Sequence, residues 1–424
     1  MDDLNLACRD CGEHYRTRGD LPRRGSLRCR RCGATLWRAP AARFPDPRAF
    51  ALTAAIFLVL VNTFPVFDVS IMGDHRSGGV GSGAVALMTY GSGISAGSGI
   101  SAVGALVALI AVAIPAISIA LTLVVLFYLW AGASHRAQIP RIVGLTWRAA
   151  VHLRPWSMLD VFLLAAVVAY TRLGQLADTA IGVGGYALAA FVVIQVLIDQ
   201  MLGRDRVWSA IDNPLKYSPP PGAPAMLCLD CDLVVAARTE EGAARRHCPR
   251  CHARLAWRRP GSLATTVAFS IAGLILYLPA NLFPVLSVTR FGHTEAYTIM
   301  GGIRDLAAAG LWPLALLVLL ASIIVPVLKL ASLGWCLVAI RWRSRLLLRQ
   351  RTVLHRFVRY IGRWSNIDVF VVAMVVALVQ FGFITTIEPG PGIASFAAVV
   401  VLTMIATDAF DSRLMWDAVS EGRK

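Results

Sequence analysis

Charge is scarce in this chain, and lysine is almost missing. Only 16% of the 424 residues are charged, and just three of the 41 basic residues are lysines: Lys216, Lys329 and Lys424. Hydrophobic residues make up 57% of the chain, and the mean hydropathy is +0.63. A water-soluble protein of this length could not bury so much apolar surface. The composition excludes an ordinary soluble protein and predicts a polytopic membrane protein.

Familiar catalytic signatures are missing as well. No lysine follows a glycine-rich turn as in a Walker A loop, and the zinc-protease pattern His-Glu-x-x-His does not occur. No pair of histidines lies in an apolar run where it could hold haem. The sequence therefore excludes nucleotide hydrolysis by a Walker A loop, and we expect the chain not to be an enzyme.

The features that are present occur twice. Two Cys-x-x-Cys pairs precede each apolar half, separated by 17 residues in the first half and by 16 in the second: Cys8, Cys11, Cys29 and Cys32, then Cys228, Cys231, Cys248 and Cys251. Asn-x-Phe-Pro-Val follows at 62–66 and 281–285, and Trp-Ser-x-x-Asp-Val-Phe at 156–162 and 364–370. The chain is a tandem duplication of a unit of roughly 210 residues. Internal repeats are a recurrent build of transporters.

The cysteine quartets predict two metal sites. Thiols at this spacing can occupy the corners of a tetrahedron around one ion. The expected cofactor is one structural Zn²⁺ per quartet, because four protein ligands leave no open position for a substrate. Rubredoxin-like iron and redox-active dithiols are the alternatives. Disulfides are disfavoured because the topology predicted below places both modules in the cytosol. Cys336, alone in an apolar run, is expected to be a packing residue.

The predicted fold is an all-α polytopic membrane protein with two repeats, each a small cytosolic zinc ribbon and a four-helix transmembrane module. The apolar runs predict eight spans, at 49–67, 102–131, 158–174, 183–201, 263–286, 311–341, 367–387 and 392–410. The predicted units are a first zinc ribbon at 1–40, a first membrane module at 41–212, a linker and second ribbon at 213–260, and a second membrane module at 261–424.

Arginines outside the predicted spans set the orientation. They concentrate in 132–157 and 341–363, which the positive-inside rule assigns to the cytoplasm. Both termini and both ribbons then lie in the cytoplasm too. The segments expected on the outer side are the Gly/Ser-rich segment 73–101, which looks flexible, the segment 287–310, and the tips near Asp178 and Glu388. Because the first 45 residues are polar, we expect no cleavable signal peptide.

The net charge of +16 does not predict a nucleic-acid partner. Most basic residues flank the spans, where topology and anionic lipids account for them. Residues 345–363 can form a helix with an apolar face that includes Leu354 and Phe357 and a basic face that includes Arg356 and Arg359. We expect an interfacial helix on the inner leaflet. A basic helix that docks a partner is the alternative.

Lys329 is the most unusual residue inside a predicted span. It lies roughly 18 Å along the helix from Arg341, too far for its ammonium group to reach the interface easily. A buried cation is expensive and is usually functional, and lysine can lose its proton whereas arginine cannot. Pro326 precedes it and leaves the carbonyl of Ser322 without its helical donor. These residues predict a polar kink facing a cavity; in the first repeat Ser118 replaces the lysine.

A buried ammonium needs acceptors or a counter-charge. Asp368 is the leading candidate, and the others are Glu388, Asp408, Thr403 and Ser365. The Ser-x-x-Asp pattern is also that of a helix capping box, which would explain Asp368 and Asp160 without any functional role. A purely structural role for Lys329 is open as well. Asn62 and Asn281 are expected to repair the broken ends of their helices with local hydrogen bonds.

The combination of these motifs resembles the paraquat-inducible protein A family of Gram-negative inner membranes. The likeness rests on tandem Cys-x-x-Cys modules, the Asn-x-Phe-Pro motif, Pro-x-x-Lys in the second half only and Trp-Ser-x-x-Asp-Val-Phe. It covers nearly the whole chain. The resemblance implies a periplasmic MCE-domain protein as partner, membrane phospholipids as substrate and movement of lipid across the envelope. It also implies that Lys329 belongs to a polar network in the second membrane module.

The predicted function is that of an inner-membrane component of an intermembrane lipid transport system, which loads or receives lipid at a periplasmic tunnel. We expect a protonation change at Lys329, biased by Asp368 or Glu388, to open or close a cavity. The predicted substrate and coupling network is Lys329, Asp368, Ser322, Ser365, Pro326, Thr403 and Glu388. The alternatives are a non-transporting scaffold or sensor whose zinc ribbons bind a cytosolic partner or nucleic acid, and an electron carrier with two iron sites.

Overall fold

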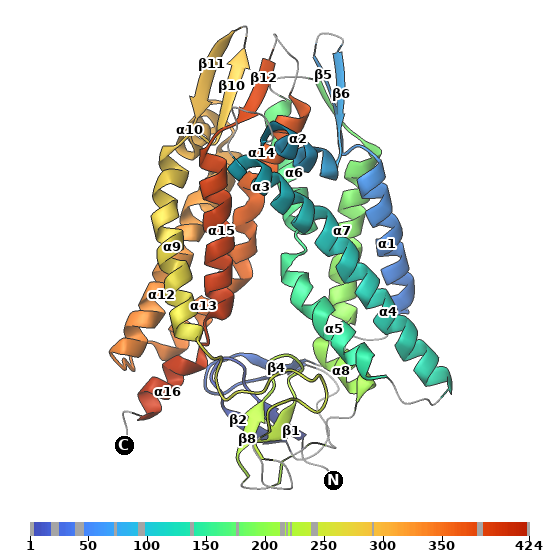
Figure 1. The fold of residues 1–424 in the computed structure, drawn as a ribbon, viewed down its shortest axis with the longest axis vertical. Helices are drawn as coiled ribbons and strands as arrows, with labels where there is room; N and C mark the ends of the chain where they lie inside the picture. Colours follow the sequence, from blue (N-terminus) through green and yellow to red (C-terminus); the bar gives the residue numbers. More distant parts are fainter. Residues whose placement is uncertain are drawn as a thin grey trace.

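Two bundles of helices stand side by side in the computed structural model of the chain (Figure 1). Small sheets lie at one end and the cysteine modules at the other, which we call the sheet end and the ribbon end. The structure describes residues 4–17, 25–38, 46–71, 74–91, 98–135, 140–174, 178–212, 217, 219–220, 223–238, 245–290, 292–379 and 385–421. Lys216 and Lys424 lie outside these residues.

Seven helical segments of the described chain are long and apolar enough to cross a membrane: Gly99–Ala131, Arg141–Thr171, Val183–Met201, Ser262–Leu282, Trp312–Arg341, Leu348–Leu378 and Gly392–Ala409. An eighth apolar helix, α1 (Pro47–Thr63), has 17 residues. The protein is therefore a multi-pass membrane protein, and these eight segments correspond to the eight expected spans. Side chains on the outer faces, such as Leu274, Ile275 and Leu278, are exposed and apolar, as lipid contact requires.

Four of the long segments are composite. Their elements are α3 (Ser98–Ala108), η1 (Leu109–Ala113) and α4 (Ile114–His135); α5 (Arg141–Leu153), η2 (Arg154–Trp156) and α6 (Leu159–Leu173); α11 (Trp312–Leu319), η4 (Leu320–Ile324) and α12 (Val325–Arg341); α13 (Leu348–Ile361), η5 (Gly362–Asn366) and α14 (Ile367–Leu378). The remaining spans are α7 (Val183–Met201), α9 (Ser262–Leu282) and α15 (Gly392–Ala409).

The two π-helical turns, η1 and η4, occupy equivalent places in the two repeats. Each ends just before a proline, Pro115 or Pro326. A proline cannot donate to the carbonyl four residues earlier, so the backbone widens by one residue there. The expected irregularity at Pro326 is present, and the first repeat has it too.

Small antiparallel sheets at the sheet end repeat as well, and the sequence analysis did not predict them. β5 (Phe67–Ile71) lies between β6 (Asp74–Gly78) and β7 (Asp178–Ile181), and β10 (Leu286–Arg290) lies between β11 (His293–Tyr297) and β12 (Thr385–Pro389). The strand that follows the Asn-x-Phe-Pro-Val motif is central in both sheets. Each sheet thus connects the end of the first helix to the start of the last helix of its module.

Two expectations about this end are wrong. The span predicted at 367–387 ends at Leu378, and β12 follows from Thr385, where β-branched residues favour a strand. The segment 73–101 is not simply a flexible loop, because it contains β6, α2 (Val80–Gly91) and the start of α3; residues 92–97 lie outside the described part of the chain. Helix α2 packs against α3 and α14. A Cβ at Gly83 would lie 2.7 Å from the carbonyl oxygen of Ala373, so the small residues permit close helix packing.

The Asn-x-Phe-Pro-Val turns make the same contacts in both repeats. Asn62 donates from Nδ2 to the carbonyl of Leu58, and Asn281 to that of Tyr277, each over 2.8 Å. The expected repair of a helix end is thereby confirmed. The carbonyls of Pro65 and Pro284 accept from the first turns of α7 and α15, both over 2.9 Å. The motif therefore joins the first and last helices of its module.

Helix α14 lies at the centre of the molecule and is buried on all sides. It packs against α2 and α6 of the first repeat, with Phe370 edge-to-face against Phe162 at 5.3 Å between ring centroids. A helix that is apolar around its whole circumference is typical of such a position. Cys336 packs in a neighbouring apolar cluster, as expected.

The basic helix expected at 345–363 is present as α13, but it does not simply present its apolar face to the interior. Arg351, Thr352 and His355 are buried against the protein, whereas Phe357 and Tyr360 are exposed. The helix folds back on α12 and continues through η5 into α14. The arginines expected on the basic face, such as Arg349 and Arg359, are exposed. The interfacial position of this helix therefore stays a prediction.

Candidate functional site

Each cysteine module is built from two knuckles with the same backbone pattern. The first contains β1 (Leu4–Ala7), β2 (His14–Thr17), β3 (Ser26–Arg28) and β4 (Thr35–Arg38); the second contains β8 (Ala225–Leu227), β9 (Val234–Ala236) and a bridge between His247 and Arg254. In every knuckle the main-chain carbonyl of the first cysteine accepts a hydrogen bond from the amide of the residue that follows the second cysteine. That residue has a positive φ in all four: Gly12, Gly33, Asp232 and His252.

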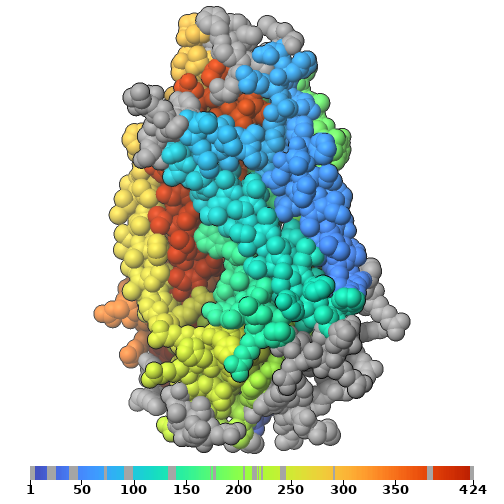
Figure 2. Space-filling view, turned by 45° about the vertical axis from the view of Figure 1, so that its right-hand side comes forward, coloured from blue at the N-terminus to red at the C-terminus, as the bar shows by residue number. Residues whose placement is uncertain are grey.

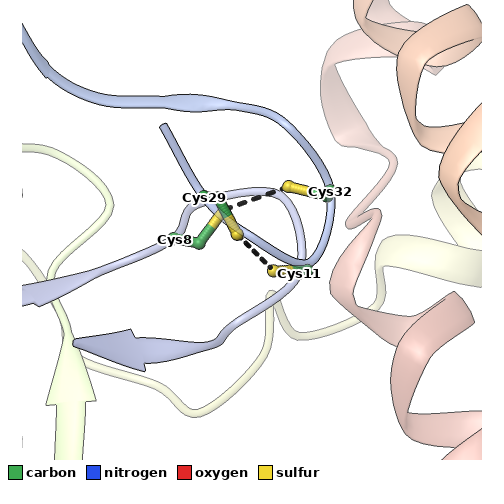
Figure 3. Close-up of side chains that lie close together, drawn as sticks. All are labelled: Cys8, Cys11, Cys29 and Cys32. Atoms are coloured by element: carbon green, nitrogen blue, oxygen red, sulfur yellow. Dashed lines mark hydrogen bonds between the residues drawn. The ribbon is translucent and has the colours of Figure 1, made fainter. Parts of the chain in front are cut away.

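The four thiols of each module converge on one point. Figure 3 shows Cys8, Cys11, Cys29 and Cys32 turned toward one another. The Sγ atoms of Cys8 and Cys32 are 3.4 Å apart and those of Cys11 and Cys29 are 3.5 Å apart. The corresponding distances in the second module are 3.5 and 3.6 Å, and all eight cysteines are buried. Sulfur ligands about 2.3 Å from a tetrahedral ion would be about 3.8 Å apart, so both quartets fit a metal ion.

Groups around the first quartet support thiolates. The hydroxyl of Tyr15 lies 3.2 Å from Sγ of Cys29 and accepts from the amide of Arg30. Arg356 of α13 points Nη2 at Sγ of Cys32, 3.9 Å away. Such surrounding hydrogen bonds hold metal ligands in place and compensate their charge.

The modules dock crosswise. The first module contacts the second repeat, where Asp10 pairs with Arg356 at 2.6 Å and accepts through its carbonyl from Ser412. Arg31 stacks over Trp416 of α16 (Arg413–Glu421), 4.5 Å from the ring centroid. The second module contacts the first repeat, where Asp230 pairs with Arg148 at 2.7 Å and with His152 of α5 at 3.2 Å. The His152 hydrogen bond lowers the pKa of Asp230 below its usual value.

A buried polar cluster surrounds Lys329 in the second repeat. Its Nζ donates to Oγ of Ser365 over 2.8 Å and to Oγ1 of Thr403 over 3.4 Å. Ser365 donates to the carbonyl of Gly362 over 2.7 Å, and Thr403 to that of Val400 over 3.1 Å. Both hydroxyl protons are thus committed to the backbone, and the oxygens present lone pairs to the ammonium group. Three helical elements therefore meet at this one side chain.

A second hydrogen bond of the cluster lies toward the sheet end. Ser322 of η4 donates to the carboxylate of Asp368 in the first turn of α14. The capping box expected at 365–368 is not formed, because Asn366 is the N-cap residue, with no side-chain cap, and Ser365 bonds to Gly362 and Lys329 instead. We name Ser322, Lys329, Ser365, Asp368 and Thr403 the polar cluster.

The structure does not bring every predicted network residue to the polar cluster. Glu388 is exposed on β12, opposite Ser287 in the sheet. Pro326 is buried and follows the π-helical turn that contains Ser322, so it shapes the helix. The members of the polar cluster are at most 8% exposed.

Two cavities flank the polar cluster. One, of about 850 Å³, lies between the repeats at the ribbon end and borders Lys329, Gly362 and Asp408. Lys329 is fully buried (0% exposed) and belongs to its inner wall. The other, of about 220 Å³, borders Asp368 and Val371 beneath β10 and β12. Lys329 therefore borders one cavity, and Asp368 borders the other.

Gly362 was missed by the sequence analysis. A Cβ there would lie 2.8 Å from Cε of Lys329, so glycine leaves the room that the lysine side chain occupies. The signal lay in the difference between the repeats, since Arg154 stands at the corresponding place before the first Trp-Ser motif.

The first repeat has the same backbone without the cluster. Ser118, which stands for Lys329, is 4% exposed, and its carbonyl accepts from Thr122 over 2.8 Å. Asp160, which stands for Asp368, pairs with Arg363 of the other repeat at 3.0 Å. The same motif thus joins the repeats in one half and lies beside a buried lysine in the other.

Comparison with known proteins agrees with the duplication. The family model for paraquat-inducible protein A matches residues 46–212 and 263–420. Intermembrane transport protein PqiA of Escherichia coli (strain K12) is 31% identical over 410 residues, 93% of this chain and 91% of that protein. Lipophilic envelope-spanning tunnel protein A of the same strain is 33% identical over 270 residues, 64% of this chain and 62% of that protein.

A probable intermembrane transport protein of Haemophilus influenzae is 28% identical over 267 residues, 62% of this chain and 64% of that protein. No solved structure matches the chain. The two matched segments contain the two membrane modules, and the chain belongs to the paraquat-inducible protein A family.

Proposed function

We propose that this protein is the inner-membrane component of an intermembrane lipid transport system and passes phospholipid to or from a periplasmic MCE-domain protein. The observation that supports this most is the polar cluster at the centre of a membrane bundle, between two cavities. Ionisable residues at such depth usually mark a substrate or proton pathway. The names of the relatives, intermembrane transport protein and envelope-spanning tunnel protein, point the same way.

In this mechanism Lys329 is the switching group. As an ammonium ion it holds Ser365 of η5 and Thr403 of α15 together through their lone pairs. Loss of its proton weakens these charge-assisted hydrogen bonds and frees the three elements to move apart. Asp368, held by Ser322, biases the protonation from the sheet end. Movement at this point would join the two cavities, and no enzymatic reaction is needed.

The cysteine quartets hold one Zn²⁺ each in this proposal. Four buried cysteines whose sulfur atoms lie close enough to bind one ion form a closed site that suits a structural Zn²⁺, with no position open to substrate. The ions fix the ribbons, and the ribbons dock crosswise on the two repeats. Zinc thereby maintains the relative position of the membrane modules.

The proposed location is the inner membrane of a Gram-negative bacterium, with both termini and both ribbons in the cytoplasm. Arginines gather at the ribbon end, as the positive-inside rule requires. The sheets then face the periplasm, where the partner would bind. A cysteine introduced at Thr294 on β11 should react with a membrane-impermeant maleimide in intact spheroplasts, and one at Arg246 only after lysis. Reaction at position 246 in intact spheroplasts would reverse the orientation.

The second candidate function is that of a scaffold or sensor that moves no lipid. Half-buried ion pairs hold the ribbons on the helix bundle, and such fixed docking would serve a scaffold as well as a transporter. Lipid transfer separates the two. Proteoliposomes with labelled phospholipid would be incubated with the soluble region of the MCE partner, and lipid on the partner would be counted. A transporter accelerates transfer, and Lys329→Ala abolishes the acceleration. If protein-free liposomes transferred lipid as fast as the proteoliposomes, the result would favour the scaffold function.

A further inference from the structure

The larger cavity is strongly cationic. Among the described residues, nine arginines and Lys329 border it, against three aspartates. The arginines come from the first ribbon, α5 and η2, the second ribbon with the segment before α9, and α13 with η5. The positive-inside rule places arginines on one side of the membrane, but it does not require them to converge on one cavity.

Most of these arginines already have a carboxylate partner. Arg148 pairs with Asp230 and Arg154 with Asp199, at 2.7 and 3.2 Å. Arg363 pairs with Asp160 at 3.0 Å, and Arg9, Arg258 and Arg356 also have aspartate partners. These pairs fix the wall of the cavity and contribute little net charge to it.

Three arginines are different. Within the described chain, Arg254, Arg259 and Arg359 form no salt bridge, and all three are solvent-accessible. Arg259 donates from Nη1 to the main-chain carbonyl of Asp408. The carboxylates of Asp411 and Asp408 interact electrostatically with Arg259, that of Asp408 also interacts with Arg359, and they offset part of the positive charge. With Lys329 on the inner wall, an excess of positive charge faces the cavity.

The rest of the wall suits an amphipathic molecule. Trp156, Val358 and Met404 border the same space, beside the arginines. A volume of about 850 Å³ lies within the ~300–1,000 Å³ range of sites for small molecules. The cavity lies between helices that are long and apolar enough to span the membrane, near their ribbon ends. In Figure 2, which looks at the junction of the repeats, α15 is visible between α9 and the α3–α4 segment.

We propose that this cavity binds the anionic phosphodiester headgroup of a membrane phospholipid, with Arg254, Arg259 and Arg359 as its ligands. Guanidinium groups form paired, charge-assisted hydrogen bonds to phosphate oxygens. The site rests on the proposed transport function and specifies its substrate as lipid with net negative charge. The headgroup would lie against the wall that contains Lys329.

Native mass spectrometry of the purified full-length protein tests this site. Phosphatidylglycerol, phosphatidylcholine and inorganic phosphate would be added separately. Phosphatidylglycerol should be retained about tenfold better than phosphatidylcholine, because both lipids carry the phosphodiester but phosphatidylcholine also carries a quaternary ammonium group that the cationic cavity repels. Inorganic phosphate alone should not be retained at the same concentration.

Matched variants locate the binding. The cavity variant Arg254→Gln, Arg259→Gln, Arg359→Gln should lose the preference for phosphatidylglycerol. The control Arg341→Gln, Arg343→Gln, Arg345→Gln removes the same charge near the ribbon end but outside the cavity lining, and it should retain the preference. The side chain of Arg254 forms no hydrogen bond within the part of the chain that the structure describes. Arg254→Gln alone should therefore lower retention about threefold without affecting folding.

Three results would overturn the site: equal loss in both triple variants, no preference in the wild type, or retention of inorganic phosphate without phosphatidylglycerol. Ser322→Ala separates this site from the transport proposal, because Ser322 does not border the cavity. It should lose transport and keep phosphatidylglycerol. In the wild-type protein, transport without retention of phosphatidylglycerol would overturn the headgroup site alone, and retention without transport would overturn the transport proposal alone.

Discussion

The two membrane modules share a scaffold and differ in what they bury. Both have a π-helical turn before a proline, a three-stranded sheet and an asparagine that repairs the end of the first helix. Both have a Trp-Ser-x-x-Asp motif at the start of the third span. Only the second has a lysine at the place after the proline, where the first has Ser118. The shared features are therefore those of folding, and we propose that the unshared ones serve transport.

The aspartates of the repeated motif show how one half can specialise. Asp160 forms an ion pair with Arg363 across the junction of the repeats, whereas Asp368 accepts from Ser322 within its own module. Gly362 provides space for Lys329, and Arg154 occupies its place in the first repeat and pairs with Asp199. A duplication lets one copy hold the structure together while the other accepts the cost of a buried charge.

The largest expected effect is a difference between the modules on substitution by alanine. Lys329→Ala should abolish complementation of a deletion strain, because both acceptor hydroxyls lose their common donor. Ser118→Ala should reduce activity by no more than about fivefold, the value of one neutral hydrogen bond. Membrane abundance, measured by blotting, should be unchanged in both. Similar losses in the two variants would contradict the specialisation of the second module.

The two cysteine modules should differ less. The purified protein should contain about two zinc ions per chain and little iron, and Cys8→Ser or Cys228→Ser should each remove about one. Metal analysis measures this directly. An unchanged number of zinc ions per chain in Cys228→Ser would contradict a zinc site in the second module. Iron in place of zinc would favour the electron-carrier alternative.

A smaller effect is expected where the ribbons dock. Arg356 and Asp10 should show a coupling of about 1 kcal/mol in a double-mutant cycle, because their ion pair is partly exposed. The pair Arg148 and Asp230 should behave similarly at the other ribbon. Hydrogen exchange of the ribbon strands reports detachment. Zero coupling at both pairs would mean that the crosswise docking adds no stability.

The smallest effect concerns the backbone of the knuckles. His252 has φ of 55° where the first ribbon has Gly33. His252→Gly should stabilise the second ribbon against zinc chelation by up to about 1 kcal/mol, because the left-handed region costs a residue with a Cβ about that much. Gly33→Ala should destabilise the first ribbon against zinc chelation. Faster zinc loss from His252→Gly would show that the histidine side chain contributes there.

Much of this architecture could be predicted because it depends on local pattern. Apolar runs of sufficient length gave the spans, and paired cysteines gave the ribbons. Lys329 was identified from its depth and from the scarcity of lysine, and Ser365 and Thr403 were among its expected acceptors.

Features that depend on contacts distant in the chain were not predictable in this way. The crosswise docking joins Asp10 to Arg356, and the strand at Thr385–Pro389 forms because β10 offers it an edge. The segment 73–101 was interpreted as flexible from its glycines and serines, although small residues there permit α2 to approach α14 closely. Glu388 was a candidate because it is acidic and near a span, and its position on β12 removes it from the polar cluster.

The central claim is that the second module works through a removable proton on Lys329. Complementation by Lys329→Arg, with membrane abundance verified, tests it most directly. Arginine keeps its charge at every accessible pH and has a larger, planar head group than lysine. We predict that Lys329→Arg fails nearly as completely as Lys329→Ala at normal abundance. Full activity of Lys329→Arg, with loss of protein only in Lys329→Ala, would show a structural cation and contradict the proposal.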